Sequence, residues 1–357
     1  MYLTGEKMLL EELLKRAREI GASDLHITVG VPPTYRQNGR LVTFDDNKLL
    51  PADTKELVRS MLNDEQWRVF EETGELDLSF SLKGMARFRA NVYKQRGTCC
   101  AAIRIVNLTI PSFDELGIPD IVRELGKRTK GLILVTGPTG SGKSTTLASL
   151  IDMINRERDC HILTLEDPIE YLHRHNKSIV NQREIGNDSY SYAAALRAAL
   201  REDPDVILVG EMRDIETIGI AVTAAETGHL VLSTLHTIGA ANTIDRIIDV
   251  FPPHQQQQIR VQLSSVIQGV ISQQLIPRKD IAGRAAAVEI MVANPAIRNL
   301  IREGKTHQIN SQIQMGSRFG MQTMDSSIAN LHKKGVISQE EALIHATDQE
   351  NLMRFMG

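Results

Sequence analysis

Residues 130–146 of the chain read KGLILVTGPTGSGKSTT. The apolar run 132–135 predicts a buried strand, the glycines after it predict a tight turn, and a helix is expected to begin at Lys143. This order of elements is the context in which the pattern G-x-x-x-x-G-K-[ST] forms a phosphate-binding loop, known as Walker A. The pattern is satisfied in full by Gly137, Gly142, Lys143 and Ser144.

The residue types of the loop explain what it is expected to bind. Glycines allow successive backbone N–H groups to point at phosphate oxygens, and the following helix adds the positive end of its dipole. Lys143 is expected to reach the β- and γ-phosphates, and the Ser144 hydroxyl is expected to ligate Mg²⁺. A glycine-rich turn without a ligand is the alternative. The residues predicted to bind the nucleotide are Gly137, Pro138, Thr139, Gly140, Ser141, Gly142, Lys143, Ser144 and Thr145.

The composition limits the class of protein. A chain of 357 residues is expected to form two domains, and 42% hydrophobic with 24% charged residues is ordinary for a globular protein. A net charge of −3 provides no global basic field for nucleic acid. The three cysteines, Cys99, Cys100 and Cys160, match neither a disulfide framework nor a zinc pattern, which predicts a reducing compartment.

The sequence contains no segment expected to enter a membrane. No run approaches the roughly 18 apolar residues that a spanning helix needs. The N-terminal stretch is too charged for a signal peptide and instead predicts an amphipathic helix along Leu10, Leu13, Leu14, Ala17 and Ile20. We therefore expect a cytoplasmic protein without direct membrane insertion, which contacts the membrane only through a partner.

Residues 1–108 are expected to form an α+β domain without a catalytic motif. Asn38-Gly39 predicts a hairpin turn, residues 51–73 have helical spacing, and three strands are expected around 76–80, 88–92 and 102–106. Residues 109–118 are predicted to be a linker because of Pro111, Ser112 and Gly117.

Three arginines of this domain have two possible roles. On the strand predicted from Met85 to Tyr93, alternation places Arg87 and Arg89 opposite the apolar side chains, and Arg104 interrupts an apolar strand. They can belong to a solvated sheet face, which the spacing alone favours. Alternatively, they are guanidinium donors directed at a phosphate that is bound elsewhere.

From residue 119 to 357 the pattern changes to buried strands that alternate with helices, which predicts a parallel sheet with crossovers. Only helices are expected from about residue 295 to 357. The strands are predicted at 131–136, 161–165, 178–181, 205–209, 229–234 and 286–292.

Carboxylates follow two of these strands. The strand 205–209 is followed by Gly210-Glu211, which resembles a Walker B segment except that glycine occupies the usual carboxylate position, so that Glu211 is expected to take that role one residue later. The strand at 161–165 is followed by the cluster Glu166, Asp167 and Glu170. One member of this cluster is expected to polarise the attacking water, and one can reach the metal.

Two histidines and two arginines are further candidates. His229 and His236 bracket a strand, and a histidine there either is structural or senses the γ-phosphate or Glu211. Arg197 and Arg201 lie four residues apart and hence on one helix face, where they either pair with Glu202 or Asp203 or face a phosphate.

Together these stretches resemble the secretion and pilus ATPases of the type II/type IV family, a hexameric branch of the RecA-like P-loop proteins. The resemblance covers nearly the whole chain. It is carried by GASDLHI, GPTGSGKSTT, TLEDPIEY, LREDPDVILVGEMRD and TGHLVLSTLHT, in the order of that family. Residues 296–305, AIRNLIREGK, resemble the AIRNLIRE motif of the retraction ATPases, and no cysteine follows Cys160 to form the zinc module usual in assembly and secretion ATPases.

The resemblance implies a Mg²⁺-dependent ATPase with a RecA-like domain behind a smaller PAS-like domain. It makes Glu170 the expected catalytic carboxylate, Glu211 the Walker B glutamate with Ser144 and Glu211 near Mg²⁺, and His229 the main histidine. It also raises Arg89, Arg104, Arg197 and Arg201 to phosphate-contact candidates.

The resemblance also implies partners and a mechanism. The expected partners are five further copies in a homo-hexamer and an inner-membrane platform protein of the type IV pilus. Loss of the γ-phosphate would release arginine contacts and drive pilus retraction in twitching motility. The alternatives are a pilus assembly or type II secretion ATPase, an accessory retraction ATPase and, from another class, a nucleic-acid translocase.

Overall fold

The computed structural model describes residues 9–37, 39–82, 86–106 and 109–356. The predictions that concern Asn38, Met85 and the chain at 107–108 lie outside these ranges. The chain divides into two compact units, of which the first consists of Met1–Thr109 with Glu170–Leu172 and the second of Ile110–Ile169 and His173–Gly357.

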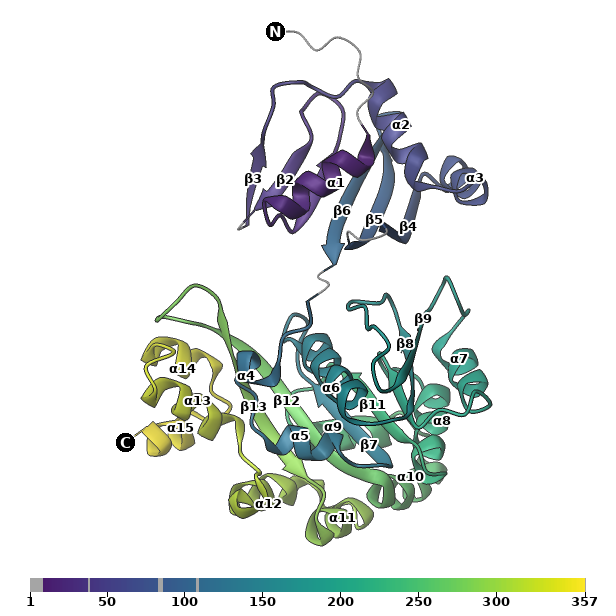
Figure 1. The fold of residues 1–357 in the computed structure, drawn as a ribbon. Coiled ribbons are helices and arrows are strands. Elements are labelled where there is room, and N and C mark those ends of the chain that lie inside the picture. The colour runs from purple at the N-terminus through teal and green to yellow at the C-terminus, as the bar shows by residue number, and fades with distance from the viewer. Residues whose placement is uncertain (1–8, 38, 83–85, 107–108, 357) are drawn as a thin grey trace. The chain divides into compact units, whose positions relative to one another are not determined.

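The first unit is a six-stranded antiparallel sheet with helices, in the strand order β3-β2-β1-β6-β5-β4 (Figure 1). Phe88 and Ala90 are buried while Arg89 is exposed, so the predicted alternation on β5 is confirmed. The strands are β1 (Asp24–Ile27), β2 (Thr34–Gln37), β3 (Arg40–Thr43), β4 (Glu75–Leu82), β5 (Ala86–Gln95) and β6 (Thr98–Val106). The helices are α1 (Leu10–Glu19), α2 (Pro51–Met61) and α3 (Asp64–Thr73).

The second unit contains a seven-stranded sheet in the order β13-β12-β7-β11-β10-β8-β9. Its strands run parallel except for β13, which is antiparallel to β12. Every predicted strand of this unit is present, and β12 is an additional one that the sequence pattern did not predict. The strands are β7 (Gly131–Thr136), β8 (His161–Glu166), β9 (Ile179–Glu184), β10 (Val206–Val209), β11 (Leu230–Leu235), β12 (Ile267–Pro277) and β13 (Arg284–Val292).

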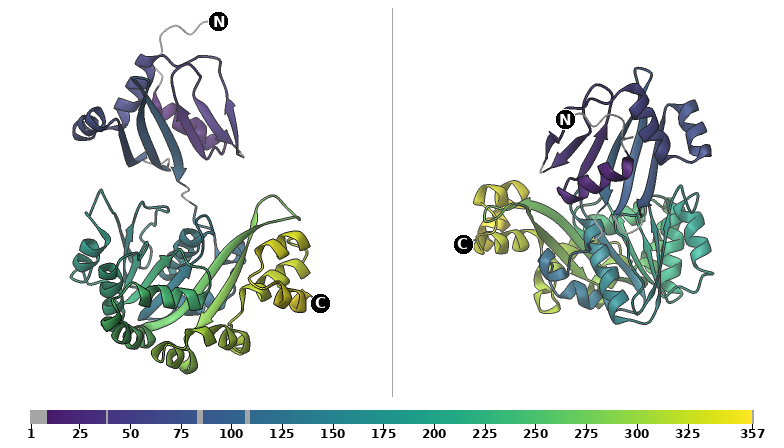
Figure 2. Two further views of the ribbon diagram at one scale, coloured as in Figure 1. Left: turned by 180° about the vertical axis from the view of Figure 1, so that it is seen from behind. Right: turned by 45° about the horizontal axis from the view of Figure 1, so that its top comes forward.

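Helices lie on both faces of this sheet, and the last of them gather beside β12 and β13 (Figure 2). They are α4 (Phe113–Leu116), α5 (Ile121–Gly126), α6 (Lys143–Glu157), α7 (Tyr192–Ala199), α8 (Ile215–Glu226), α9 (Ala240–Asp249), α10 (Pro253–Val266), α11 (Pro295–Arg302), α12 (Ile309–Met315), α13 (Met324–Lys333), α14 (Gln339–His345) and α15 (Gln349–Met356). The predicted α/β class with C-terminal helices is confirmed. None of the described helices is long and apolar enough to cross a bilayer.

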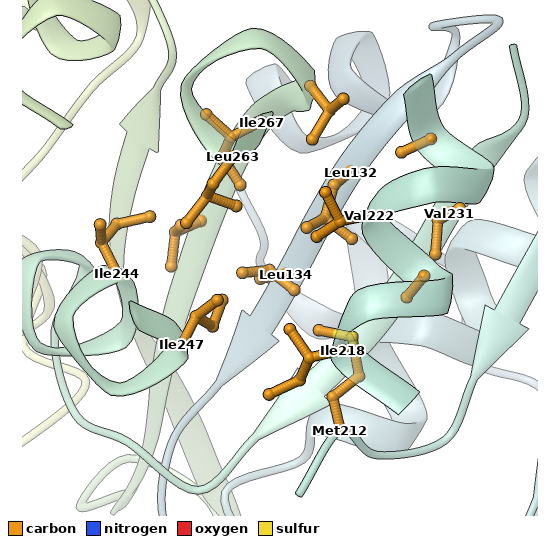
Figure 3. Packing of buried hydrophobic residues seen from close by; sticks show 14 of the residues in the cluster. Leu132, Leu134, Met212, Ile218, Val222, Val231, Ile244, Ile247, Leu263 and Ile267 are labelled. Atoms are coloured by element: carbon orange, nitrogen blue, oxygen red, sulfur yellow. The ribbon is translucent and has the colours of Figure 1, made fainter. Parts of the chain in front are cut away.

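Alternating side chains of the strands build the core on each face of the sheet. On β7, Ile133 and Val135 pack with α4, α5 and α6, while Leu132 and Leu134 pack on the other face with residues of α7 to α12. Figure 3 shows the second of these clusters around Leu134. A strand buried on both faces therefore delivers the phosphate loop from a fixed position.

The described part of the predicted linker, 109–118, contains a short helix instead of an extended connection. Phe113 at the start of α4 and Ile118 just after it are buried in the same core as Ile133. Burying the apolar side chains of Phe113 and Ile118 against the sheet lowers the free energy of the folded chain. This gain outweighs the preference of the neighbouring proline and glycine for a turn. These residues accordingly belong to the second unit.

Candidate nucleotide-binding site

The candidate site lies where the parallel strands of the second unit end. Thr136 at the end of β7 is paired with Leu235 on β11 and with Ser272 on β12. The chain continues from Thr136 into the loop 137–142 and then into α6, with Gly142 in the left-handed region as its N-cap. Ligands of open α/β sheets bind outside this edge of the strands.

Lys143, the first residue of α6, is held inside the loop. Its Nζ donates to the carbonyl oxygens of Gly137 and Pro138, at 2.9 Å each, and the residue is only 7% exposed. Burial lowers the pKa of Lys143, and the negative charge of Glu211 partly opposes this. The Lys143 ammonium and the Glu211 carboxylate of one chain therefore interact electrostatically.

The loop offers further donors beside Lys143. The hydroxyl of Ser141 is buried and has no hydrogen-bond partner among the described residues. Ser144, the second residue of α6, is exposed, and Thr145 is half-buried. An unused buried hydroxyl together with free N–H groups at a helix start fits the oxygen atoms of a phosphate.

A cavity of about 480 Å³ lies between the loop and the ends of β10 and β11. Thr139 provides its wall on the loop side, and Arg246 of α9 closes it on another side. It is lined by Thr139, Glu211, Met212, Arg213, Thr234, Leu235, His236, Thr237 and Arg246. The cavity therefore combines one carboxylate with two guanidinium groups and a histidine.

Glu211 is the acidic centre of this cavity. One of its carboxylate oxygens, Oε2, is 2.8 Å from Nη2 of Arg213 and 3.6 Å from Nε2 of His236. The segment before it is fixed by the Thr234 hydroxyl, which donates to the carbonyl of Gly210 at 2.6 Å. Glu211 thus has a cationic partner and a histidine near the same carboxylate oxygen.

The structure explains why glycine stands at the usual carboxylate position. A Cβ atom at Gly210 would lie 2.7 Å from the hydroxyl oxygen of Tyr192 and 3.1 Å from the carbonyl oxygen of Leu165. Burial raises the pKa of Tyr192, and the carboxylates of Glu211, Asp167 and Glu166 raise it further, so the phenol remains a neutral hydroxyl. Tyr192 therefore occupies the space that a side chain at position 210 would need.

The three carboxylates after β8 have different surroundings. Glu166 accepts hydrogen bonds from the Thr164 hydroxyl at 2.6 Å and from the Gln182 amide at 3.2 Å. Asp167 and Glu170 are exposed, and neither lines the cavity. Hydrogen bonds from its own sheet hold Glu166, so Asp167 and Glu170 are the more available carboxylates.

His229 is not placed beside the loop of its own chain. It precedes β11 at the amino edge of the sheet, where its carbonyl accepts from Gly131 N–H at 3.0 Å and its Nδ1 lies 2.9 Å from the carbonyl of Ala224. A strand of this length separates it from the loop by about 20 Å. His229 therefore lies at the sheet edge opposite the loop of its own chain, whereas His236 at the carboxyl edge lies near Glu211.

Arg197 of α7 and Arg201, which follows that helix, do not line the cavity beside the loop. Arg197 forms an ion pair with Glu216 of α8, whereas the sequence suggested Glu202 or Asp203 as an acidic partner. Arg201 follows the C-terminal end of α7, whereas Tyr192 at the start of that helix is near Gly210. Because crossover helices run antiparallel to the strands, Arg201 lies towards the amino edge of the sheet.

In the first unit, Arg104 pairs with Asp24, with 2.9 Å between Nε and Oδ1. Arg89 lies opposite Arg104 in the register of β5 and β6 and is exposed. Burial works against ionisation of Asp24, but hydrogen bonds from Ser23 and Arg104 and the charge of Arg104 produce a net lowering of its pKa. Within this unit, Arg89 and Arg104 thus lie on a solvent-exposed face of the sheet.

Two basic residues of the cavity were not predicted as site residues, namely Arg213 and Arg246. Arg213 follows Glu211 by two residues, and this proximity was an available signal. Arg246 lies on α9 and reaches the cavity only through the packing of that helix, so its sequence neighbourhood carried no signal.

The parallel sheet, the glycine-rich loop before α6 and the carboxylate of Glu211 define a P-loop nucleotide-binding protein of the α/β class. Comparison with known families then places it: the chain belongs to the family "Type II/IV secretion system protein", which matches residues 6–344.

Among curated relatives, the chain is 49% identical over 344 residues to "Type IV pilus retractation ATPase PilT" of Pseudomonas aeruginosa, covering 96% of this chain and 100% of that protein. It is 40% identical over 349 residues to "Type IV pilus ATPase PilU" of the same organism, covering 98% of this chain and 91% of that protein. A solved structure, "Crystal Structure of the Pilus Retraction Motor PilT and Bound ADP", matches with a TM-score of 0.92 and 52% identity, covering 97% of this chain and 99% of the other.

Proposed function

We propose that this chain is an ATPase whose hydrolysis cycle drives retraction of a type IV pilus. The observation that carries the proposal is the loop 137–144, in which Lys143 donates to the carbonyl of Gly137 and beside which a cavity is lined by Thr139 and Glu211. Its support from relatives is the 49% identity to a pilus retraction ATPase over 96% of the chain. The solved relative with bound ADP supports a nucleotide as the ligand.

The residues of the site divide the work of phosphoryl transfer. The loop N–H groups and Lys143 bind and position the phosphates, and Lys143 exchanges its two carbonyl partners for phosphate oxygens. Glu211, with His236 close to its Oε2, is the carboxylate proposed to lie beside the metal. Glu170, exposed beyond β8, is proposed as the catalytic carboxylate on the basis of the family resemblance.

Magnesium fits the donors that are present. The exposed Ser144 hydroxyl and the carboxylate of Glu211 are oxygen ligands, and Mg²⁺ in nucleotide sites takes few protein ligands because phosphates and water complete its shell. When bound, Mg²⁺ would supply positive charge at the β- and γ-phosphates. Ser144 and Glu211 are thus the residues proposed to hold it.

We further propose that six copies form a ring and act on an inner-membrane platform protein from the cytoplasmic side. Support comes from Arg201, which lies towards the sheet edge opposite the loop of its own chain and is therefore available to a neighbouring subunit. For Arg89, Arg104 and Arg197 the proposed phosphate contact rests on the family resemblance. For His229 we propose a role at the phosphates of a nucleotide that is bound to another subunit.

The test is a measurement of ATP hydrolysis and of mass in solution, followed by complementation. The purified chain should hydrolyse ATP with Mg²⁺, Lys143→Ala should not, and the assembled protein should have six times the mass of 39.7 kDa. Expression in cells that have pili but no retraction motor should restore twitching. An ATPase-active hexamer that leaves the pili extended would reject retraction in favour of assembly, secretion or an accessory role.

A further inference from the structure

Strand β12, which the sequence pattern did not predict, lies directly behind the phosphate loop. It runs parallel to β7, with Ser272 opposite Thr136. Gln273 is therefore one residue beyond the point where β7 ends and the loop begins. This glutamine is only 3% exposed, so its amide is committed to the interior.

Gln273 contacts both glycines that delimit the loop. A Cβ atom at Gly137 would lie 2.2 Å from the carbonyl oxygen of Gln273, and one at Gly142 would lie 2.7 Å from its Nε2. At Gly140, by contrast, a Cβ atom would meet nothing within 4 Å. Gly137 is thus needed because the β12 backbone approaches so closely, and both glycines also have positive φ angles, of 140° and 88°.

The side chain of Gln273 also holds the helix that follows the loop. Its Oε1 accepts a hydrogen bond from the Thr146 hydroxyl at 2.8 Å, and Thr146 is fully buried. The backbone N–H of Thr146 in turn donates to the carbonyl of Gly142 at 3.0 Å. One amide group therefore connects the first turn of α6 with the end of the loop.

We propose that Gln273 is a positioning residue for the phosphate loop. Its carbonyl oxygen and amide pack closely against Gly137 and Gly142, and its hydrogen bond with Thr146 holds the start of α6, so that the loop N–H groups are preorganised for phosphate. Gln273 touches no nucleotide; it acts through these neighbours. A buried hydroxyl that loses its acceptor costs enough to change a binding equilibrium by about tenfold.

The test compares Gln273→Met with Thr146→Val, each of which removes one side of the same hydrogen bond while keeping the volume. Each variant should weaken ADP binding by about tenfold and raise the KM for ATP by a similar factor, with kcat changed by less than about threefold. Because both substitutions remove the same hydrogen bond, the double variant should bind ADP about as tightly as the single variant that has the lower ADP affinity.

Gln274→Ala is the matched control, since Gln274 is the next residue of the same strand and its Oε1 instead meets Nδ1 of His345 in α14, at 3.3 Å. Its ADP affinity should stay within about twofold of the unaltered protein. Thermal unfolding of every variant separates binding from stability, and Thr146→Val keeps the test informative if Gln273→Met fails to fold. Unchanged ADP affinity in the folded variants, or losses that multiply in the double variant, would overturn the proposal.

Discussion

The two edges of the seven-stranded sheet carry similar residue types but have different chemistry. Strand β11 has a histidine at each end. At the carboxyl edge, His236 is 3.6 Å from the Glu211 carboxylate; at the amino edge, His229 binds the carbonyl of Ala224 at the end of α8. A parallel sheet places all its strand ends of one kind together, so residues only a few positions apart in sequence belong to opposite sides of the unit.

The largest effect is expected from Lys143→Ala at the carboxyl edge. Removing the ammonium leaves the phosphates without their main cation, so ATPase activity should fall by at least about a hundredfold. Nucleotide binding measured with a fluorescent ADP analogue should weaken in parallel. An active Lys143→Ala variant would contradict the assignment of the whole edge.

Glu211→Gln should separate binding from turnover. The amide keeps the size of the side chain but cannot act as a carboxylate, so kcat should fall by about a hundredfold while ADP affinity stays within about fivefold. Steady-state kinetics and an ADP titration of the same sample provide both values. A wild-type ATPase rate would remove Glu211 as the carboxylate of the site.

The two histidines test the comparison directly. His236→Ala should lower kcat by about tenfold with little change in unfolding temperature, because its imidazole is next to Glu211. His229→Ala should leave the ADP affinity of the isolated subunit within about twofold but lower the free energy of unfolding by about 1 kcal/mol, because it loses the hydrogen bond at the end of α8. The reverse pattern would show that the amino edge also acts on the nucleotide of its own chain.

Gly210→Ala probes the crowding at the end of β10. The added methyl group meets the Tyr192 hydroxyl oxygen and the Leu165 carbonyl, so the variant should lose about 1–3 kcal/mol of unfolding free energy. Adding Tyr192→Phe removes the nearer atom and should restore part of the loss in a denaturation experiment. If Tyr192→Phe brings no recovery in the Gly210→Ala background, the tyrosine is not what requires glycine there.

The smallest effect is expected from His173, a half-buried histidine beyond the end of β8. Burial lowers the pKa of His173 to about 4 from its ordinary 6.5, with Asp152 opposing the shift. The unfolded chain therefore takes up this proton first as the pH falls, so stability is lost between pH 6.5 and about 4.

From about pH 7 to pH 6 the loss from this group is at most about 1 kcal/mol. In His173→Phe the unfolding free energy should change less over this interval than in the unaltered protein. Parallel curves for the two proteins would exclude His173 as a source of the pH dependence.

The phosphate loop was predictable because all of its parts are contiguous in the sequence. The strand 131–136, the loop and the start of α6 at Lys143 are found where the sequence placed them. Glu211 was predictable for a similar reason, since it follows a short apolar strand. His236 was an available candidate, and the rule that ligands bind at the carboxyl ends of strands selects it over His229.

Other parts of the site depend on contacts between distant segments. Gln273 is 127 positions from Thr146 and yet accepts its hydrogen bond. Arg246 reaches the cavity because α9 packs against β12 and β13, and Tyr192 occupies the space that a side chain at position 210 would need. The periodicity and spacing of a local sequence segment cannot predict such contacts between distant residues.

The sequence by itself determined that the chain has a nucleotide loop, a parallel sheet and a family, because each of these is encoded by short runs whose propensity, periodicity and glycine placement act locally. Only the tertiary structure decided which histidine faces the carboxylate, why glycine precedes Glu211 and what supports the loop from behind. Those outcomes depend on strand order and register, through which packing brings together residues that are far apart in the chain.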